Sequence, residues 1–169
     1  TGAKGTSAWL HVYLIKRTDT GVVDALFSLD AASPTMPADY DVKRRIGTVR
    51  VDGSGNILAF KQVEDDFTLA VPVNDVNVTN PCTSAVDRTL TAPPNMLARL
   101  TAYLGNATTA TVYALFTEKD QTDTTPSATL FDIRAGASAP YSVELERRVN
   151  ASSQIRSRLH ASGASDTLV

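Results

Sequence analysis

Few residues in this chain are of types that carry out covalent chemistry. Its 169 residues include a single cysteine, Cys82, and two histidines, His11 and His160. A nucleophilic cysteine or serine needs a neighbouring base, and only these two histidines are available for that role. The sequence contains no G-x-S-x-G nucleophile elbow. We interpret Cys82 as a buried or incidental thiol and predict no catalytic residue.

The acidic residues form no recognisable metal or acid–base motif. Glu64-Asp65-Asp66 offers the hard oxygen ligands that calcium prefers, but it lacks the spaced ligands of a calcium loop. We favour a solvated turn there. The carboxylates of a glycosidase are placed by the fold rather than by sequence spacing, so no acid–base pair can be chosen. We therefore expect no metal, no cofactor and no enzymatic activity.

The basic residues fit ordinary surface roles. With a net charge of −2, the chain gives no electrostatic basis for binding nucleic acid. Lys43-Arg44-Arg45 would place alternate side chains on opposite faces of a strand, as in a charged sheet edge. Four arginines near the C-terminus could hold a polyanionic glycan: Arg147, Arg148, Arg156 and Arg158. Pairing of these arginines with Glu144 and Glu146 is the alternative that we favour.

Tyrosine and tryptophan side chains are the usual platforms for sugar rings. Most of those in this chain lie within apolar runs and are predicted to be core or interface residues: Trp9, Tyr13, Tyr103 and Tyr113. Tyr40 and Tyr141 instead follow loops, at the expected starts of strands. These two are the better candidates for binding.

The elements that position these residues are predicted to be β-strands. Helical periodicity is nearly absent, whereas Thr, Val and turn residues recur at short intervals. The expected strands are 8–16, 22–29, 43–51, 56–62, 67–71, 88–92, 96–104, 109–117, 127–134, 141–149 and 155–160. A chain with 43% hydrophobic and 20% charged residues fits one globular domain. We predict an antiparallel β-sandwich of jelly-roll type over residues 8–169, after a linker or stalk end at residues 1–7.

No membrane insertion is expected, because the longest apolar runs are far shorter than the roughly 20 residues that cross a bilayer.

Two hairpins are predicted in a defined register. A four-residue loop, 52–55, would pair Val49 with Leu58 and place Phe60 over Gly47, with a bulge near Gly47-Thr48. In the second hairpin, a five-residue loop, 150–154, would pair Val149 with Ile155 and Leu145 with Leu159. The outer face would then set Glu146 against Arg158.

Two expected strands are apolar on both faces. Ala8–Ile15 carries Trp9 and Tyr13 on one face and leucines on the other, and 112–116 repeats the pattern with Tyr113 and Leu115. An antiparallel strand with one wet face should alternate, so a loop, another sheet or another subunit must cover the second face. We favour a subunit interface that includes Trp9, Tyr13, Tyr113 and Leu115.

Several segments resemble a module found near the C-termini of tailed-bacteriophage and prophage fibre proteins. These segments are WLHVYLI, GVVDALFSLDAASPTMPADYDVKRRIGTVRVDGSGNILAFKQ and NPCTSAVDRTLTAPP, with a weaker likeness in VNASSQIRSRLHASGASDTL. The recognisable elements are an aromatic–aliphatic first strand, a Pro-containing loop at Pro34–Pro37, an Arg-Arg-Ile-Gly strand at 44–47 and a strand ending in Phe60–Gln62. The resemblance implies a homotrimeric β-sandwich tip on an upstream stalk, with a further strand after Leu168 and no catalytic residues.

The leading hypothesis is therefore a non-enzymatic tail-fibre tip of the virion that binds a glycan or protein receptor on the bacterial surface. A rigid sandwich presents and varies its loops, so we expect the receptor in loops 34–40, 121–126 and 137–141. The candidate residues are Asp39, Tyr40, Gln121, Asp123 and Tyr141. Other virion proteins would contact the stalk. The alternatives are a structural virion protein, such as a head fibre or decoration protein, and a carbohydrate-active tailspike.

Overall fold

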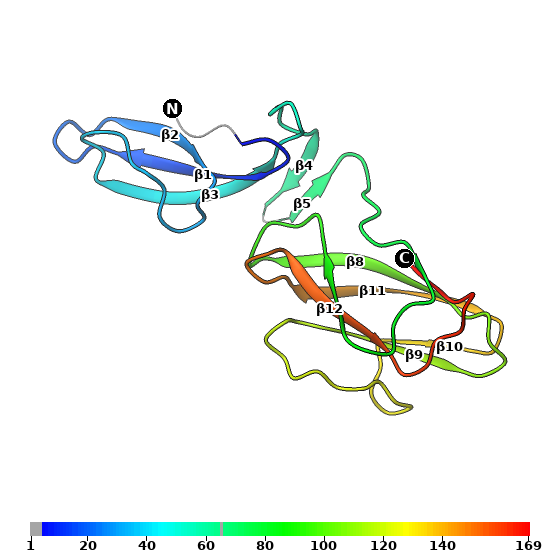
Figure 1. Ribbon diagram of the computed structural model, residues 1–169. Helices are drawn as coiled ribbons and strands as arrows, with labels where there is room; N and C mark the ends of the chain where they lie inside the picture. The colour runs from blue at the N-terminus through cyan, green and yellow to red at the C-terminus, as the bar shows by residue number, and fades with distance from the viewer. Residues whose placement is uncertain (1–4, 65) are drawn as a thin grey trace. The chain divides into compact units, whose positions relative to one another are not determined.

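A computed structural model describes residues 5–64 and 66–169, which form β-strands and loops (Figure 1). No helix occurs among these residues, and hence none that is long and apolar enough to cross a membrane. The contacts divide the chain into two compact units, Thr1–Pro72 and Val73–Val169. One sandwich was expected over residues 8–169, whereas each unit has sheets and apolar clusters of its own. The expected linker, 1–7, lies partly outside the described residues.

The N-terminal unit contains a three-stranded antiparallel sheet in the order β2-β1-β3 and a separate hairpin, β4–β5. The strands are β1 (Trp9–Lys16), β2 (Val23–Ser28), β3 (Val42–Arg50), β4 (Phe60–Val63) and β5 (Asp66–Leu69). The predicted bulge is confirmed and lies at Ile46. Val12 pairs with Gly47 and Tyr13 with Arg45, which leaves Ile46 as the extra residue.

The predicted register of the first hairpin is wrong by one residue. The Asp52 N–H donates to the Asn56 carbonyl, and Val51 pairs with Ile57, so the loop has three residues rather than four. Its last residue, Gly55, has a φ of +77°, as in a type I turn followed by a bulge. The Asp52 carboxylate favours this loop because it accepts the N–H groups of Ser54 and Asn56 at 2.8 Å.

Phe60 does not cover Gly47 as predicted. It stacks on Phe67 across the β4–β5 hairpin, with ring centroids 4.8 Å apart, and a Cβ at Gly47 would meet nothing within 4 Å. After the turn the chain stays beside β3 only as far as the hydrogen bond from the Leu58 N–H to the Arg50 carbonyl, and it then forms the β4–β5 hairpin. The sequence pattern indicated the strands but not this choice of partner.

The C-terminal unit is a sandwich of two four-stranded antiparallel sheets, in the orders β10-β9-β12-β7 and β11-β8-β13-β6. Its strands are β6 (Val78–Thr79), β7 (Val86–Thr89), β8 (Leu97–Gly105), β9 (Val112–Thr117), β10 (Ile133–Ala135), β11 (Pro140–Arg148), β12 (Gln154–Leu159) and β13 (Thr167–Leu168). Consecutive strands change sheets at every step except from β9 to β10. This strand arrangement is that of a jelly roll.

A single apolar cluster fills the space between the two sheets. β8 contributes Ala102 and Leu104, β9 contributes Ala114 and Phe116, and β13 contributes Leu168, all of them buried. Both sheets alternate inward and outward side chains, which is the burial pattern of a sandwich.

The second predicted hairpin has the correct turn but the wrong ladder. The Asn150 N–H donates to the Gln154 carbonyl, so these two residues close a three-residue loop, 151–153, at the register that was predicted for the turn. Beyond this turn β11 pairs with β8, whereas β12 pairs with β7 and β9. Leu145 and Leu159 therefore belong to one core cluster but lie on opposite sheets, and Glu146 faces Arg99 instead of Arg158.

The last strand is short and lies inside a sheet. Leu168 of β13 pairs with Leu104 of β8 on one side and with Val78 of β6 on the other. The C-terminal residue continues this pairing, since Val169 and Tyr103 exchange main-chain hydrogen bonds of 2.8 and 3.0 Å. Residues 167–168 thus form a strand that the sequence analysis did not predict.

Candidate binding loops

Loops and a hairpin of the same unit cover one face of β1. Tyr13 and Ile15 form a buried cluster with Leu26, and Met36 and Tyr40 of the loop between β2 and β3 pack against it. The Tyr13 hydroxyl donates to the Asp30 carbonyl at 3.0 Å. At the start of the strand, the buried Trp9 ring contacts Phe67 of β5 and lies under the Arg50 guanidinium.

The second two-faced strand, β9, is also covered by a loop of the chain. The Tyr113 ring lies 5.4 Å from the ring of Phe131, in the loop between β9 and β10, and 4.9 Å from that of His160. Leu115 on the same face is buried. Of the four predicted interface residues, Trp9, Tyr13 and Leu115 are thus buried within the chain, and Tyr113 is partly buried. Their apolar character requires no second subunit.

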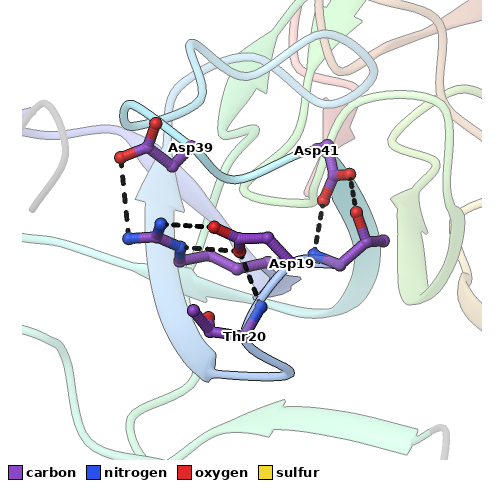
Figure 2. Close-up of polar contacts among 6 residues, drawn as sticks. Asp19, Thr20, Asp39 and Asp41 are labelled. Carbon is purple, nitrogen blue, oxygen red and sulfur yellow. Dashed lines mark hydrogen bonds and ion pairs between the residues drawn. The ribbon is translucent and has the colours of Figure 1, made fainter.

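The predicted residues Asp39 and Tyr40 lie beside the turn that joins β1 to β2. The Arg17 guanidinium forms ion pairs with two carboxylates that are labelled in Figure 2, at 2.7 Å from Asp19 and 3.5 Å from Asp39. The Asp41 carboxylate accepts hydrogen bonds from the main-chain N–H and the hydroxyl of Thr18. The hydrogen bond from Arg17 lowers the pKa of Asp19, and that from Thr18 lowers the pKa of Asp41. This network fixes the loop that carries Tyr40.

The loop between β9 and β10, residues 118–132, is anchored by two arginines of β12, which lies later in the sequence. Arg156 donates to the carbonyls of Gln121 and Lys119, and Arg158 forms an ion pair of 2.6 Å with Asp123. Arg158 also donates to the Thr83 carbonyl at 3.0 Å. The arginines predicted to pair with Glu144 and Glu146, or to hold a polyanion, instead tie this loop to β12.

A third arginine closes the far end of the same loop. Arg147 of β11 forms an ion pair of 2.6 Å with Asp132 and donates to the Phe116 carbonyl at 2.9 Å. The second Asp132 oxygen accepts the Phe116 N–H at 2.7 Å. The Asp132 side chain thus bonds to β9 beyond Ala114, where the pairing with β10 has ended. We name residues 118–132 the anchored loop.

An open pocket lies between the anchored loop and β11. Its volume is 510 Å³, within the range of about 300–1,000 Å³ typical of ligand sites. The buried β9 residues Leu115 and Phe116 contribute to the lining, and so do the exposed Leu130 and Phe131. Polar groups line the remainder: Thr117, Glu118, Gln121, Thr122, Thr124, Asp132, Glu146 and Arg147.

The structure brings only some of the predicted binding residues together. Gln121 lines the pocket, and Asp123 lies in the same anchored loop. Tyr141 is exposed at the start of β11, opposite Leu104. The strand rises about 23 Å from Tyr141 to Arg148, whose N–H binds Glu118 at the anchored loop. Tyr141 therefore belongs to another part of the sandwich, and Asp39 and Tyr40 belong to the N-terminal unit.

Three residues that shape the pocket were missed by the sequence reasoning. Phe131 and Asp132 fell inside a predicted strand over 127–134, but β10 begins only at Ile133. Arg147 was assigned to surface pairing. The usable signal was the long polar stretch after Thr117, which is too rich in Thr, Asp and Pro to continue a strand.

The remaining candidates for chemistry stay isolated. Among residues 5–64 and 66–169, no group of three or more His, Cys, Asp or Glu side chains is placed to hold a metal ion. Asp65 of the predicted acidic turn lies outside these ranges. Cys82 is exposed, which leaves the incidental thiol as its interpretation.

No protein-family model matches the chain, and no curated protein or solved structure matches it significantly.

Proposed function

We propose that this chain is a non-enzymatic recognition module, the tip of a bacteriophage tail fibre that binds a receptor on the bacterial surface. The observation that carries the proposal is the anchored loop: a long irregular segment held by Arg147, Arg156 and Arg158 beside an open pocket. A loop that is ordered before it meets its ligand loses less conformational entropy on binding. The resemblance of residues 9–62 to phage fibre modules supplies the virion context.

Self-association into a homotrimer belongs to this proposal. One face of the β2-β1-β3 sheet carries Leu14, Phe27, Val23 and Val42, which share a face by their cross-strand pairing. Leu14 is 42% exposed and Phe27 is 37% exposed. Lys16 and Arg44 lie on the same face, beside these apolar residues. Exposed apolar surface bordered by polar residues is typical of an interaction site. Three weak receptor sites on one fibre would then bind with high avidity.

The second candidate function is a structural role in the virion, as a head fibre or decoration protein. The same apolar face of the β2-β1-β3 sheet favours it, because another virion protein could cover that face as well as a second copy. Labelling the protein on intact particles and locating the label by electron microscopy separates the two roles. A label on the capsid rather than the tail would contradict the tail-fibre proposal.

A cell-binding assay tests receptor recognition. The fluorescently labelled chain is incubated with a panel of bacterial strains, and bound protein is counted by flow cytometry. We expect saturable binding to some strains, reduced by substitutions in the anchored loop such as Gln121→Ala and Asp123→Ala. Absence of saturable binding to every strain would contradict the proposal. Release of reducing ends from the cell-surface polysaccharide would instead indicate the carbohydrate-active tailspike.

A further inference from the structure

The charges that line the pocket restrict the class of ligand it can take. Three carboxylates, Glu118, Asp132 and Glu146, face it together with one guanidinium, that of Arg147. Arg147 is engaged by the Asp132 carboxylate and by the carbonyls of Phe116 and Glu146. An anionic group in the pocket would therefore meet excess negative charge and a cation that is already paired.

Glu146 is paired with Arg99 at 3.0 Å and Asp132 with Arg147 at 2.6 Å, so the excess negative charge of the lining is that of Glu118. Arg148, Arg156 and Arg158 do not alter this balance. Arg156 and Arg158 direct their guanidinium groups to the anchored loop itself, where they bind the carbonyl of Gln121 and the carboxylate of Asp123. Arg148 donates to the Asn95 carbonyl at 3.1 Å. None of the three lines the pocket. A polyanionic glycan would have to break these contacts before it could use the arginines.

The uncharged part of the lining fits a sugar ring. Phe131 is 39% exposed, and with Leu130 it offers an apolar surface to the C–H face of a pyranose. Gln121, Thr122 and Thr124 offer an amide and two hydroxyls, which both donate and accept hydrogen bonds. The carboxylates accept hydrogen bonds from sugar hydroxyl groups, and such charge-assisted bonds are stronger than neutral ones.

We infer that the pocket beside the anchored loop binds an uncharged saccharide and rejects acidic ones. The inference rests on the proposed receptor-binding function and names the ligand class of that same site. It assigns Phe131 the role of stacking platform. The residues of the 118–124 segment supply the hydrogen bonds that select the sugar.

Saturation-transfer NMR on the full chain tests the inference. The probes are neutral tetrasaccharides of glucose, galactose or N-acetylglucosamine, with tetragalacturonate as the acidic match for the galactose chain. We expect at least one neutral probe to bind, with a Kd at least about tenfold below that of tetragalacturonate. Equal or tighter binding of tetragalacturonate would overturn the inference, and so would no binding of any neutral probe.

Substitutions locate the binding in the pocket. Phe131→Leu retains an apolar contact for Tyr113 but removes the aromatic platform, and Thr122→Ala removes one exposed hydroxyl. We expect each substitution to raise the Kd of the neutral probe by about threefold or more. Thr101→Ala, on the outer face of β8, is the matched control and should leave this Kd unchanged. An effect of Thr101→Ala equal to that of Thr122→Ala would count against the pocket.

Neutralising one carboxylate of the pocket provides a second, independent readout, the relative affinity for acidic and neutral saccharides. Glu118→Gln keeps an oxygen that accepts the Arg148 N–H but removes one negative charge from the pocket. We expect the ratio of tetragalacturonate to neutral affinity to rise by about threefold or more, and Glu144→Gln, on β11 outside the pocket lining, to leave it unchanged. An unchanged ratio in Glu118→Gln would contradict the charge argument.

The same variants distinguish failure of this inference from failure of the receptor-binding function. Binding to bacterial cells that survives Phe131→Leu and Thr122→Ala, with no neutral probe bound, would leave the proposed function standing and remove the inference. Absence of binding to both cells and saccharides would remove both.

Discussion

Asn106 and Asp166 show how single buried residues organise the loops between strands of the sandwich. The Asn106 amide nitrogen lies within 2.7 to 3.2 Å of the carbonyls of Ala110, Ala135 and Gly136, and its oxygen accepts the Thr108 N–H. Asp166, which is fully buried, accepts N–H groups from two loops, those of Ala107 and Gly163. Each buried side chain thus finds its hydrogen-bond partners in main-chain groups of more than one loop.

Removing the Asn106 amide is expected to destabilise the C-terminal unit. Asn106→Ala removes a buried hydrogen bond to the Ala135 carbonyl and two part-buried ones to Ala110 and Gly136, and we expect the free energy of unfolding to fall by about 3 kcal/mol. Urea unfolding followed by circular dichroism measures the change. Asn77→Ala, at an exposed asparagine of the same unit, is the control and should stay within about 0.5 kcal/mol of the parent. A similar loss in both variants would contradict a specific role for Asn106.

His11 makes the stability of the N-terminal unit dependent on pH. Its side chain is 2% exposed, and its Nδ1 lies 3.2 Å from the Thr48 hydroxyl. Burial lowers the pKa of His11 below the usual 6.5, and the charge of Arg45 lowers it further against the opposing effect of Asp30. The folded state therefore holds the neutral ring, whereas the unfolded chain gains a proton as the pH falls through 6.5. Stability is full above that pH and is lost as the solution becomes more acidic.

Trp9 fluorescence reports this loss directly, because it is the only tryptophan and lies in the N-terminal unit. We expect the urea midpoint of the fluorescence transition to fall between pH 7 and pH 5. His11→Gln, which cannot titrate, should flatten that dependence. A midpoint in His11→Gln that still follows pH as in the parent would assign the effect to other groups.

At the scale of elements, the sequence predicted where strands lie better than which strands pair. β1, β3, β8 and β11 agree with their predicted bounds to within a residue or two, because their apolar patterns and turn residues are local signals. The turns after Val51 and Val149 share one chemistry: an Asp or Asn oxygen accepts N–H groups two and four residues on. After Val149 the chain nevertheless crosses to the opposite sheet. Side-chain parity indicates the buried face but does not distinguish a neighbour in the sheet from one across the core.

The candidate site was predictable only in part for the same reason. The polar composition of 118–126 marked a loop and brought Gln121 and Asp123 to attention. Its contacts come from Arg147, Arg156 and Arg158, which lie far along the sequence, and a single sequence gives no signal for such long-range pairs. The two-faced strands predicted a covering element correctly, and the chain's own loops cover the Tyr13 face of β1 and the Tyr113 face of β9.

Loosening the anchored loop is expected to raise its mobility without unfolding the sandwich. Arg158→Gln removes the ion pair with Asp123, and the partly exposed pair is worth about 1 kcal/mol or less to global stability. We expect faster amide hydrogen exchange over 119–126, measured by mass spectrometry, with unchanged exchange in β8 and β11. Arg134→Gln on the exposed side of β10 is the control. Unchanged exchange over 119–126 in Arg158→Gln would show that Arg158 is not needed to hold the loop.

At the scale of the whole molecule, the two units divide the work of the proposed function. The jelly roll has the larger core and carries the anchored loop with its pocket. The N-terminal unit has a smaller sheet whose open face carries Leu14 and Phe27. We assign recognition to the first and self-association to the second. A monomeric pocket of this open shape would bind a saccharide weakly, so the proposed function depends on several copies acting together.

Sedimentation velocity tests that assignment. We expect the chain to sediment as a trimer that dissociates in SDS, because the association rests on non-covalent apolar contact through the β2-β1-β3 face. Leu14→Glu and Phe27→Glu place a charge on that face and should shift the population to monomer, since an unpaired charge in an apolar interface is strongly unfavourable. Val71→Glu, at an exposed valine outside the strands of this sheet, is the matched control and should remain trimeric. A parent chain that sediments as a monomer at micromolar concentration would contradict the homotrimer. A trimer that survives both charged variants would place its interface on another surface.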